Sequence, residues 1–405
     1  MSRREILRDS GVRGLVAAET ISLAGSQMTY IVLPWFVLTT TGSAVRTSIV
    51  VAAELAPVAF LGLASGTIVS KVGARRVMIA SDVARAMLLG AIPTLHLAGL
   101  LSFPLLVALV FCIGAFMVPH ATAQRVIVPE LVGDHEGRVG EVQSLIQVAW
   151  ALAGIAGPAL GGVLIGVVGE TNVLFIDAAS YAVSATLLAG WVRPRHRLDV
   201  DDREAGVVAG VRFLFRDRLL RVWMLSITGI NVVWNAFAVI FPVLVLERYG
   251  ERPEILGWIF GSFGVGAIVG SVMTFGVIAR LDRIVMASAA GAGQTAVLWM
   301  LLPDLPWPVV AAAAAVTGVF SPVLNSAVIT TRTMRTPPSL RPSVHAAAVT
   351  VALVLAPLGA LSAGPLLELG LATAVGAVLA LNTLCGIAFV AAGVRERRVV
   401  AAASA

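Results

Sequence analysis

Three acidic residues lie inside long apolar runs of the 405-residue sequence: Glu19, Glu54 and Asp177. An ionisable side chain in such a run is costly inside a membrane and is often functional there. Because a carboxyl group can bind and release a proton, these residues are candidates for reversible protonation. We expect Glu54 to be the principal group. Glu19 lies only about five residues, or ~7.5 Å of helix, from the end of its run and could instead reach lipid headgroups.

Polar side chains recur every three or four positions in four apolar runs, which places them on one helical face. Such stripes predict a cavity with polar and aromatic walls. Alternatively, hydroxyl groups bond to their own helix or join neighbouring helices, the histidine is simply hydrogen-bonded, and the tryptophans fill space. The asparagines are harder to explain in this way, because an amide finds few partners in lipid. The candidate cavity residues are Ser26, Gln27, Tyr30, His120, Gln124, Trp150, Asn231, Trp234, Asn235, Ser321 and Asn325.

The sequence lacks the patterns of soluble enzyme chemistry. It has no Walker-type phosphate loop, no Cys/His metal spacing and no nucleophile with a base at a recognisable distance. Cys112 and Cys385 lie in apolar runs and are interpreted as small core residues. The net charge of +6 is spread over short connectors and is not gathered in one patch. We therefore expect no enzymatic activity, cofactor, metal or nucleic-acid partner.

The composition places these side chains in a membrane protein. Hydrophobic residues make up 58% and charged residues 13% of the chain, whereas soluble domains carry roughly 25% charged residues. A crossing needs ~20 apolar residues, so the length leaves no room for a sizeable soluble domain. The sequence predicts an all-α membrane protein with transmembrane helices at 14–38, 47–69, 76–98, 104–125, 141–166, 172–192, 221–246, 255–279, 284–302, 308–330, 343–366 and 371–393.

The connectors between these twelve helices predict orientation and domain division. Most Lys and Arg residues fall in alternate connectors and in both tails, which by the positive-inside rule places both termini in the cytoplasm. The longest polar stretch divides the helices six and six. We expect an N-terminal six-helix bundle at 1–192, a cytoplasmic linker at 193–220 and a C-terminal six-helix bundle at 221–405.

The two halves also show signs of duplication. The connector SGTIVSKVGARR after the second helix is similar to FGVIARLDR after the eighth. The fifth helix carries Gly157-Pro158, and its counterpart, the eleventh, carries Ala356-Pro357. Duplicated halves are a usual route to transporter folds, whose substrate site lies between the repeats near the bilayer midplane.

Four stretches carry a resemblance to a known family. They are GTIVSKVGARRVMIASDVARA, GIAGPALGG in the fifth helix, AGVRFLFRDRLLR before the seventh, and LGWIFGSFGVGAIVGS in the eighth. Over nearly its full length the chain resembles the major facilitator superfamily, and within it the branch of bacterial drug, macrolide and siderophore exporters. The resemblance implies the major facilitator fold of two six-helix bundles.

The first of these stretches is similar to the family's motif between helices 2 and 3, which forms a charge-relay latch. The usual Asp-Arg pair of that motif is Ser70-Lys71 here, so its acid is missing. Asp82 lies at a helix end within reach of Arg75 or Arg76 and could compensate. The gating residues that the resemblance implies are Gly66, Lys71, Gly73, Arg75, Arg76, Asp82 and Arg85.

GIAGPALGG resembles the family's helix 5 signature, which is associated with exchange of substrate for protons. Helices in lipid associate by close packing, and small residues let their backbones approach. Pro158 removes a backbone hydrogen bond and permits a bend. We expect this helix to pack closely and to rock against its counterpart; the alternative is that the motif serves packing alone. Its residues are Gly154, Gly157, Pro158, Gly161 and Gly162.

The first helix departs from the branch pattern Ser-x-x-Gly-Asp, because Ser26 occupies the acid position. Another group must then bind protons, which favours Glu54. The resemblance implies a monomeric, proton-coupled exporter (antiporter) of hydrophobic or amphiphilic small molecules such as drugs. Its partners would be that substrate, protons and the lipid bilayer of the bacterial cytoplasmic membrane. The alternatives are a dedicated exporter of one metabolite, such as a siderophore or macrolide, and a transport-inactive scaffold or sensor.

Overall fold

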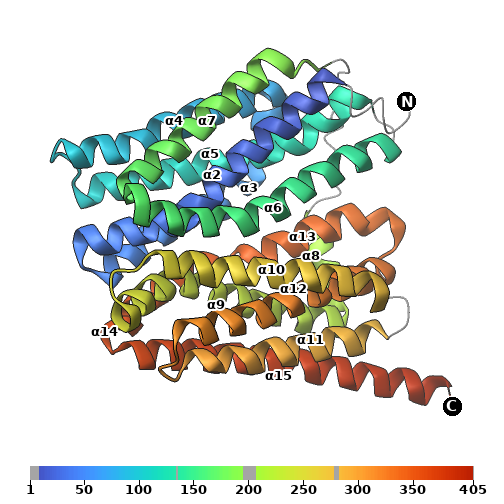
Figure 1. The fold of residues 1–405 in the computed structure, drawn as a ribbon. Helices are drawn as coiled ribbons and strands as arrows, with labels where there is room; N and C mark the ends of the chain where they lie inside the picture. Colours follow the sequence, from blue (N-terminus) through green and yellow to red (C-terminus); the bar gives the residue numbers. More distant parts are fainter. Residues whose placement is uncertain (1–8, 134–135, 195–206, 278–281, 405) are drawn as a thin grey trace. The chain divides into compact units, whose positions relative to one another are not determined.

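The computed structural model describes residues 9–133, 136–194, 207–277 and 282–404, and its regular structure in these ranges is entirely helical (Figure 1). Within the described residues, 12 helices are long and apolar enough to cross a membrane. They coincide with the predicted runs, so the all-α membrane fold is confirmed. Large apolar side chains such as Met87 and Leu384 are 64% and 66% exposed, as expected for surfaces that face lipid.

The chain forms two compact units, Met1–Asp201 and Asp202–Ala405. The described helices of the first unit are α2 (Ser10–Thr41), α3 (Ala44–Val72), α4 (Ala74–Leu97), α5 (Phe103–Val132), α6 (Glu136–Val168) and α7 (Glu170–Trp191). Those of the second unit are α8 (Val207–Arg216), α9 (Arg218–Tyr249), α10 (Glu254–Val277), α11 (Arg283–Leu298), η1 (Trp299–Leu301), α12 (Trp307–Arg335), η2 (Pro338–Leu340), α13 (Arg341–Leu353), α14 (Ala356–Glu368) and α15 (Leu371–Ser404).

Local sequence explains where several helices begin and end. The side chain of Asp9 caps α2 by accepting hydrogen bonds from the backbone N–H groups of Gly11 and Val12. Gly73 joins α3 to α4 with a φ of 93°, a conformation that side chains other than glycine rarely adopt.

Two helices differ from the predicted runs. The eleventh span is divided, because α13 ends at Leu353 and α14 begins at Ala356. Pro357 has no N–H to donate to the carbonyl group of Leu353 four residues earlier, so the helix is interrupted there. α15 continues to Ser404, beyond the predicted end at 393. Hydropathy indicates where a chain leaves the membrane, whereas the Arg and Ala residues that follow continue the helix.

The short helix α8 is the amphipathic segment expected before the seventh span. Its Leu214 is fully buried in a cluster with Val344 and Ala347 of α13. Gly210 lies so close to α13 that a Cβ there would collide with the carbonyl group of Ser343. The described end of the linker is therefore packed onto the second unit.

The two units repeat one scheme of helix packing. α2 packs against α6 and α7, and α9 packs against α14 and α15. α3 pairs with α5, and α10 pairs with α12. The close contacts repeat as well: a Cβ on Gly114 of α5 would collide with the carbonyl group of Glu54, and one on Gly318 of α12 with that of Phe263. This shared scheme is the internal duplication that the connectors predicted.

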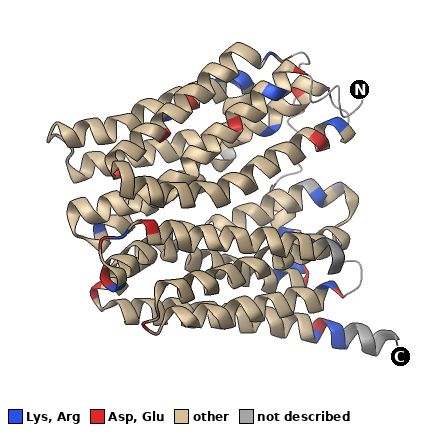
Figure 2. Cartoon of the chain, in the orientation of Figure 1, with Lys and Arg blue, Asp and Glu red and all other residues tan. Residues whose placement is uncertain are grey.

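Charged residues are placed differently in the two units. In the first unit, several acidic residues lie part-way along helices, whereas in the second most lie near helix ends and connectors (Figure 2). Among the described residues, the buried acidic side chains all lie in the first unit.

Candidate functional site

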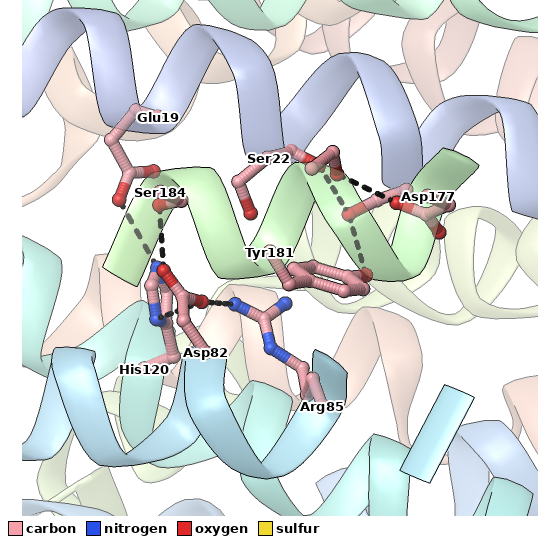
Figure 3. A network of polar contacts seen from close by, with 10 residues as sticks. Glu19, Ser22, Asp82, Arg85, His120, Asp177, Tyr181 and Ser184 are labelled. Atoms are coloured by element: carbon pink, nitrogen blue, oxygen red, sulfur yellow. Dashed lines mark hydrogen bonds and ion pairs between the residues drawn. The ribbon is translucent and has the colours of Figure 1, made fainter. Parts of the chain in front are cut away.

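Four helices of the first unit bring charged and polar side chains into one buried network (Figure 3). α2 supplies Glu19 and Ser26, α4 supplies Asp82 and Arg85, α5 supplies His120, and α7 supplies Tyr181 and Ser184. Glu19, Arg85 and His120 are only 5%, 4% and 7% exposed, and Asp82 is fully buried. So many ionisable groups inside one bundle are costly to bury, which marks the network as a functional candidate.

The imidazole of His120 lies between two carboxylates. Its Nε2 is 3.1 Å from Oε1 of Glu19, within hydrogen-bonding distance. Its Nδ1 is 3.2 Å from Oδ1 of Asp82, which is ion-pair distance without the alignment of a hydrogen bond. An imidazole so placed is suited to holding a proton between two acids.

Asp82 is the centre of the network. Its Oδ1 accepts a hydrogen bond from Nη2 of Arg85, which is one helical turn away on α4. Its Oδ2 accepts a hydrogen bond of 2.6 Å from Oγ of Ser184 on α7. With His120 on α5, this carboxylate connects three helices. The sequence places Asp82 within reach of Arg75 or Arg76, whereas in the structure this carboxylate pairs with Arg85 on its own helix.

Arg85 extends the network toward α2. Its guanidinium carbon lies 4.2 Å from the centroid of the Tyr181 ring, a cation–π distance. The hydroxyl group of Tyr181 is 2.9 Å from Oγ of Ser26. Ser26, a predicted cavity residue at the acid position of the branch pattern, is joined in the structure to the buried charges through Tyr181.

Asp177 forms an adjacent polar site. It is fully buried, accepting hydrogen bonds from Thr29 at 2.5 Å and from Ser180 at 2.9 Å. A Cβ on Gly25 would collide with both Asp177 and Ser180. Sequence reasoning missed Gly25, although this glycine belongs to the Ser-x-x-Gly pattern of the first helix.

Glu54, the favoured proton-binding residue, is not part of this network. It is half-buried on α3, and within the described part of the chain its side chain makes no hydrogen bond or ion pair. It interacts electrostatically with Asp177 and Tyr30. The structure therefore brings Glu19 and His120 together and leaves Glu54 apart from both.

Lys71 lies in the last turn of α3, and Arg75 and Arg76 lie at the start of α4. Nη2 of Arg75 donates a hydrogen bond of 2.5 Å to the backbone carbonyl group of Ala189 near the end of α7. Lys71 and Arg76 are exposed. Arg85, grouped with these residues by the motif, belongs instead to the buried network.

The glycines of the fifth helix face α2. A Cβ on Gly157 would lie 2.5 Å from Cβ of Gln27, and one on Gly161 would lie 3.2 Å from Cα of Met28. A Cβ on Gly154 would lie 3.1 Å from the amide nitrogen of Gln27. The expected close packing is confirmed at these three glycines, and its partner is α2, the helix that carries Glu19.

The remaining cavity candidates are scattered. Asn231 and Asn235 donate hydrogen bonds of 2.9 and 2.8 Å to carbonyl groups of their own helix, those of Ile227 and Asn231. Each of the two asparagine amides therefore finds its hydrogen-bond partner within its own helix. Tyr30, Trp150 and Asn325 are exposed, and Ser321 is half-buried.

Trp234 and Gln124 are the last two cavity candidates, and both are half-buried. Trp234 packs edge-to-face against Phe237 and Phe263. The amide nitrogen of Gln124 is buried without a hydrogen-bond partner among the described residues. In the same part of the chain, no group of His, Cys, Asp and Glu side chains is arranged to hold a metal ion.

A family model described as Major Facilitator Superfamily matches residues 15–360. The chain belongs to the Major Facilitator Superfamily. The multidrug efflux pump Tap of Mycolicibacterium fortuitum is 29% identical over 360 residues, which cover 85% of this chain and 86% of that pump. The Tap pump of Mycobacterium bovis is 28% identical over 385 residues, covering 92% and 90%.

Solved structures agree on the fold. The nucleoside transporter NupG matches with a TM-score of 0.74 at 11% identity, covering 94% of this chain and 98% of NupG. At that identity the match shows the major facilitator fold alone. The chain is thus a multi-pass membrane transporter of this superfamily, as the motifs predicted.

Proposed function

We propose that this facilitator is a proton-coupled exporter of amphiphilic, drug-like small molecules, and that the network around His120 couples export to protons. The observation that carries the coupling proposal is the position of His120 between Glu19 and Asp82, at 3.1 and 3.2 Å. The export proposal rests on the Tap relatives, which are named multidrug efflux pumps and align along most of the chain.

Charge balance supports a role in proton binding. Without a proton on His120, the group formed by Glu19, Asp82, Arg85 and His120 has two negative charges and one positive charge. One proton on the imidazole makes the group neutral. A net charge in a buried site is costly. The protonated group is therefore stable in a conformation that keeps it away from water. Loss of the proton favours a conformation in which water reaches the group.

Each member then has a distinct task. Glu19 and His120 exchange the proton, since they are hydrogen-bonded to each other on facing helices. Asp82 orients the imidazole, and Arg85 and Ser184 hold Asp82 in place. Loss of the proton alters the attraction between α2, α4 and α5, which links protonation to helix movement.

Glu54 and Asp177 form a second acidic pair in this proposal. The two residues interact electrostatically, and Asp177 is bound to α2 through Thr29. We assign them to substrate recognition, because a cationic amphiphile would be attracted by a half-buried carboxylate without a fixed partner. Tyr30, beside Glu54, would contribute aromatic surface.

The test is efflux of a fluorescent cationic dye from cells that produce the protein, with and without a protonophore. We expect efflux that the protonophore abolishes, and roughly tenfold or greater loss of efflux in Glu19→Gln and His120→Asn. Glu368→Gln, an exposed acid at the end of α14, is the matched control and should export normally.

Each other outcome has a defined meaning. Dye efflux that persists with the protonophore would contradict proton coupling. Normal efflux in Glu19→Gln and His120→Asn, with loss in Glu54→Gln, would move the proton site to Glu54. No efflux of any cationic dye would contradict the drug-exporter proposal and favour a dedicated metabolite exporter.

A further inference from the structure

The second unit has an apolar groove between α11 and α15 that the proposed transport cycle does not use. These helices run side by side in Figure 1 and pack against each other. The groove encloses about 810 Å³, within the usual range for small-molecule sites. Small residues create it, since Ala292 and Ala296 of α11 and Gly386 and Ala391 of α15 line its walls.

One end of the groove is closed by a hydrogen bond. Nε1 of Trp299 donates to Oγ1 of Thr383 at 3.0 Å, and both residues belong to the lining. From Thr383 the groove follows α15 to Arg395, twelve residues later, which corresponds to ~18 Å of helix. Half of the bilayer hydrocarbon core is ~15 Å thick. The groove thus has the length of one acyl chain within one leaflet.

The other end carries positive charge. Arg395 and Arg398 both line the groove and, being three residues apart, lie on the same side of α15. In the part of the chain that the structure describes, neither has an acidic partner. Arg397 between them is different, because it lies 3.9 Å from Asp282 at the start of α11.

We infer that this groove binds one anionic phospholipid, with an acyl chain along the apolar wall and the phosphate on Arg395 and Arg398. The wall is open to lipid, with Ile387 61% exposed. Arg395 and Arg398 supply the charge complementarity that selects an anionic headgroup. Free phosphate would leave the apolar length of the groove empty, and a second copy of the chain would bring its own arginines to the same place.

The test is native mass spectrometry of the purified, delipidated full-length protein with phosphatidylglycerol or phosphatidylcholine of identical chains. Wild type should retain one phosphatidylglycerol with roughly tenfold preference over phosphatidylcholine. The double variant Arg395→Gln/Arg398→Gln should bind both lipids about equally. Ala296→Phe and Ala391→Phe, which fill the groove, should each lose the bound lipid.

The charge control is Arg212→Gln/Arg216→Gln on α8, two exposed arginines of the same unit. This control should keep the preference, and an equal loss there would show diffuse surface attraction and overturn the inference. Unchanged phosphatidylglycerol binding in Arg395→Gln/Arg398→Gln would also overturn it. So would displacement of the lipid by inorganic phosphate, or a dimer that forms in place of the lipid adduct. Thermal unfolding of each variant checks that lost binding does not reflect lost folding.

Discussion

The two units share their helix packing and differ in the chemistry of their interiors. In the first unit, Asp82 and Asp177 are fully buried inside helices. In the second, no acidic residue of the described part is in the buried core. Its corresponding helices α9 and α15 are joined by an aromatic pair, since the rings of Trp223 and Phe389 stack at 4.7 Å with an interplanar angle of 14°.

The difference shows that the packing scheme and the buried charge are separate properties. Close glycine contacts between helices occur in both units, as at Gly157 against α2 and Gly359 against α9. The scheme therefore needs no buried acid. Within the described residues, the second unit shows the same scheme without buried acids.

The largest effect is expected where a buried charge loses its partner. Asp82→Asn removes the carboxylate that holds Arg85 and Ser184, leaving a cation buried in the bundle. We expect the free energy of unfolding to fall by about 3–5 kcal/mol and transport to be lost. Thermal unfolding in detergent and dye efflux measure these two effects. Asp304→Asn in the second unit is the control, because that side chain is 82% exposed. Equal destabilisation by both variants would break the contrast between the units.

A smaller effect, equal in both units, is expected from the glycine contacts. Gly157→Leu and Gly359→Leu place a side chain where α6 meets α2 and where α14 meets α9. Each should destabilise its unit by about 1–3 kcal/mol, measured by thermal unfolding. Gly140→Leu, also on α6 but with open space around it, should have little effect. Destabilisation by Gly157→Leu alone would contradict the inference that the two units share one packing scheme.

The smallest effect concerns the aromatic interior of the second unit. Trp223→Phe keeps a ring against Phe389 but removes the hydrogen bond from Nε1 to the carbonyl group of Phe389, at 3.1 Å. We expect a loss of about 0.5–1.5 kcal/mol without any change in the protonophore sensitivity of efflux. Altered sensitivity would show that the second unit takes part in proton coupling.

Sequence reasoning succeeded where local signals decide the outcome. The apolar runs correctly predicted the membrane-spanning helices of the described residues. The glycines of the fifth helix correctly indicated close packing. Hydropathy could not show the break before Pro357 or the continuation of α15, because both depend on backbone hydrogen bonding and not on membrane burial.

The candidate site was harder to predict because its pairs join distant segments. Glu19 and His120 are on different helices, and only the three-dimensional packing of the first unit reveals that their side chains lie 3.1 Å apart. Asp82 is grouped with the latch because it matches the family motif between helices 2 and 3. The three-residue spacing of Asp82 and Arg85 was the one local signal of the buried pair, since it places both on one helical face.

Proton movement in proteoliposomes tests the central claim most directly. The purified protein would be reconstituted with a pH-sensitive dye inside the vesicles, and proton flux would be recorded when an exported substrate is added. The account predicts substrate-dependent proton flux in wild type and, at a substrate concentration raised to offset weaker substrate binding, in Glu54→Gln. It predicts loss of that flux in Glu19→Gln, with substrate exchange between the two sides still measurable. Wild-type proton flux in Glu19→Gln together with its loss in Glu54→Gln would contradict the account.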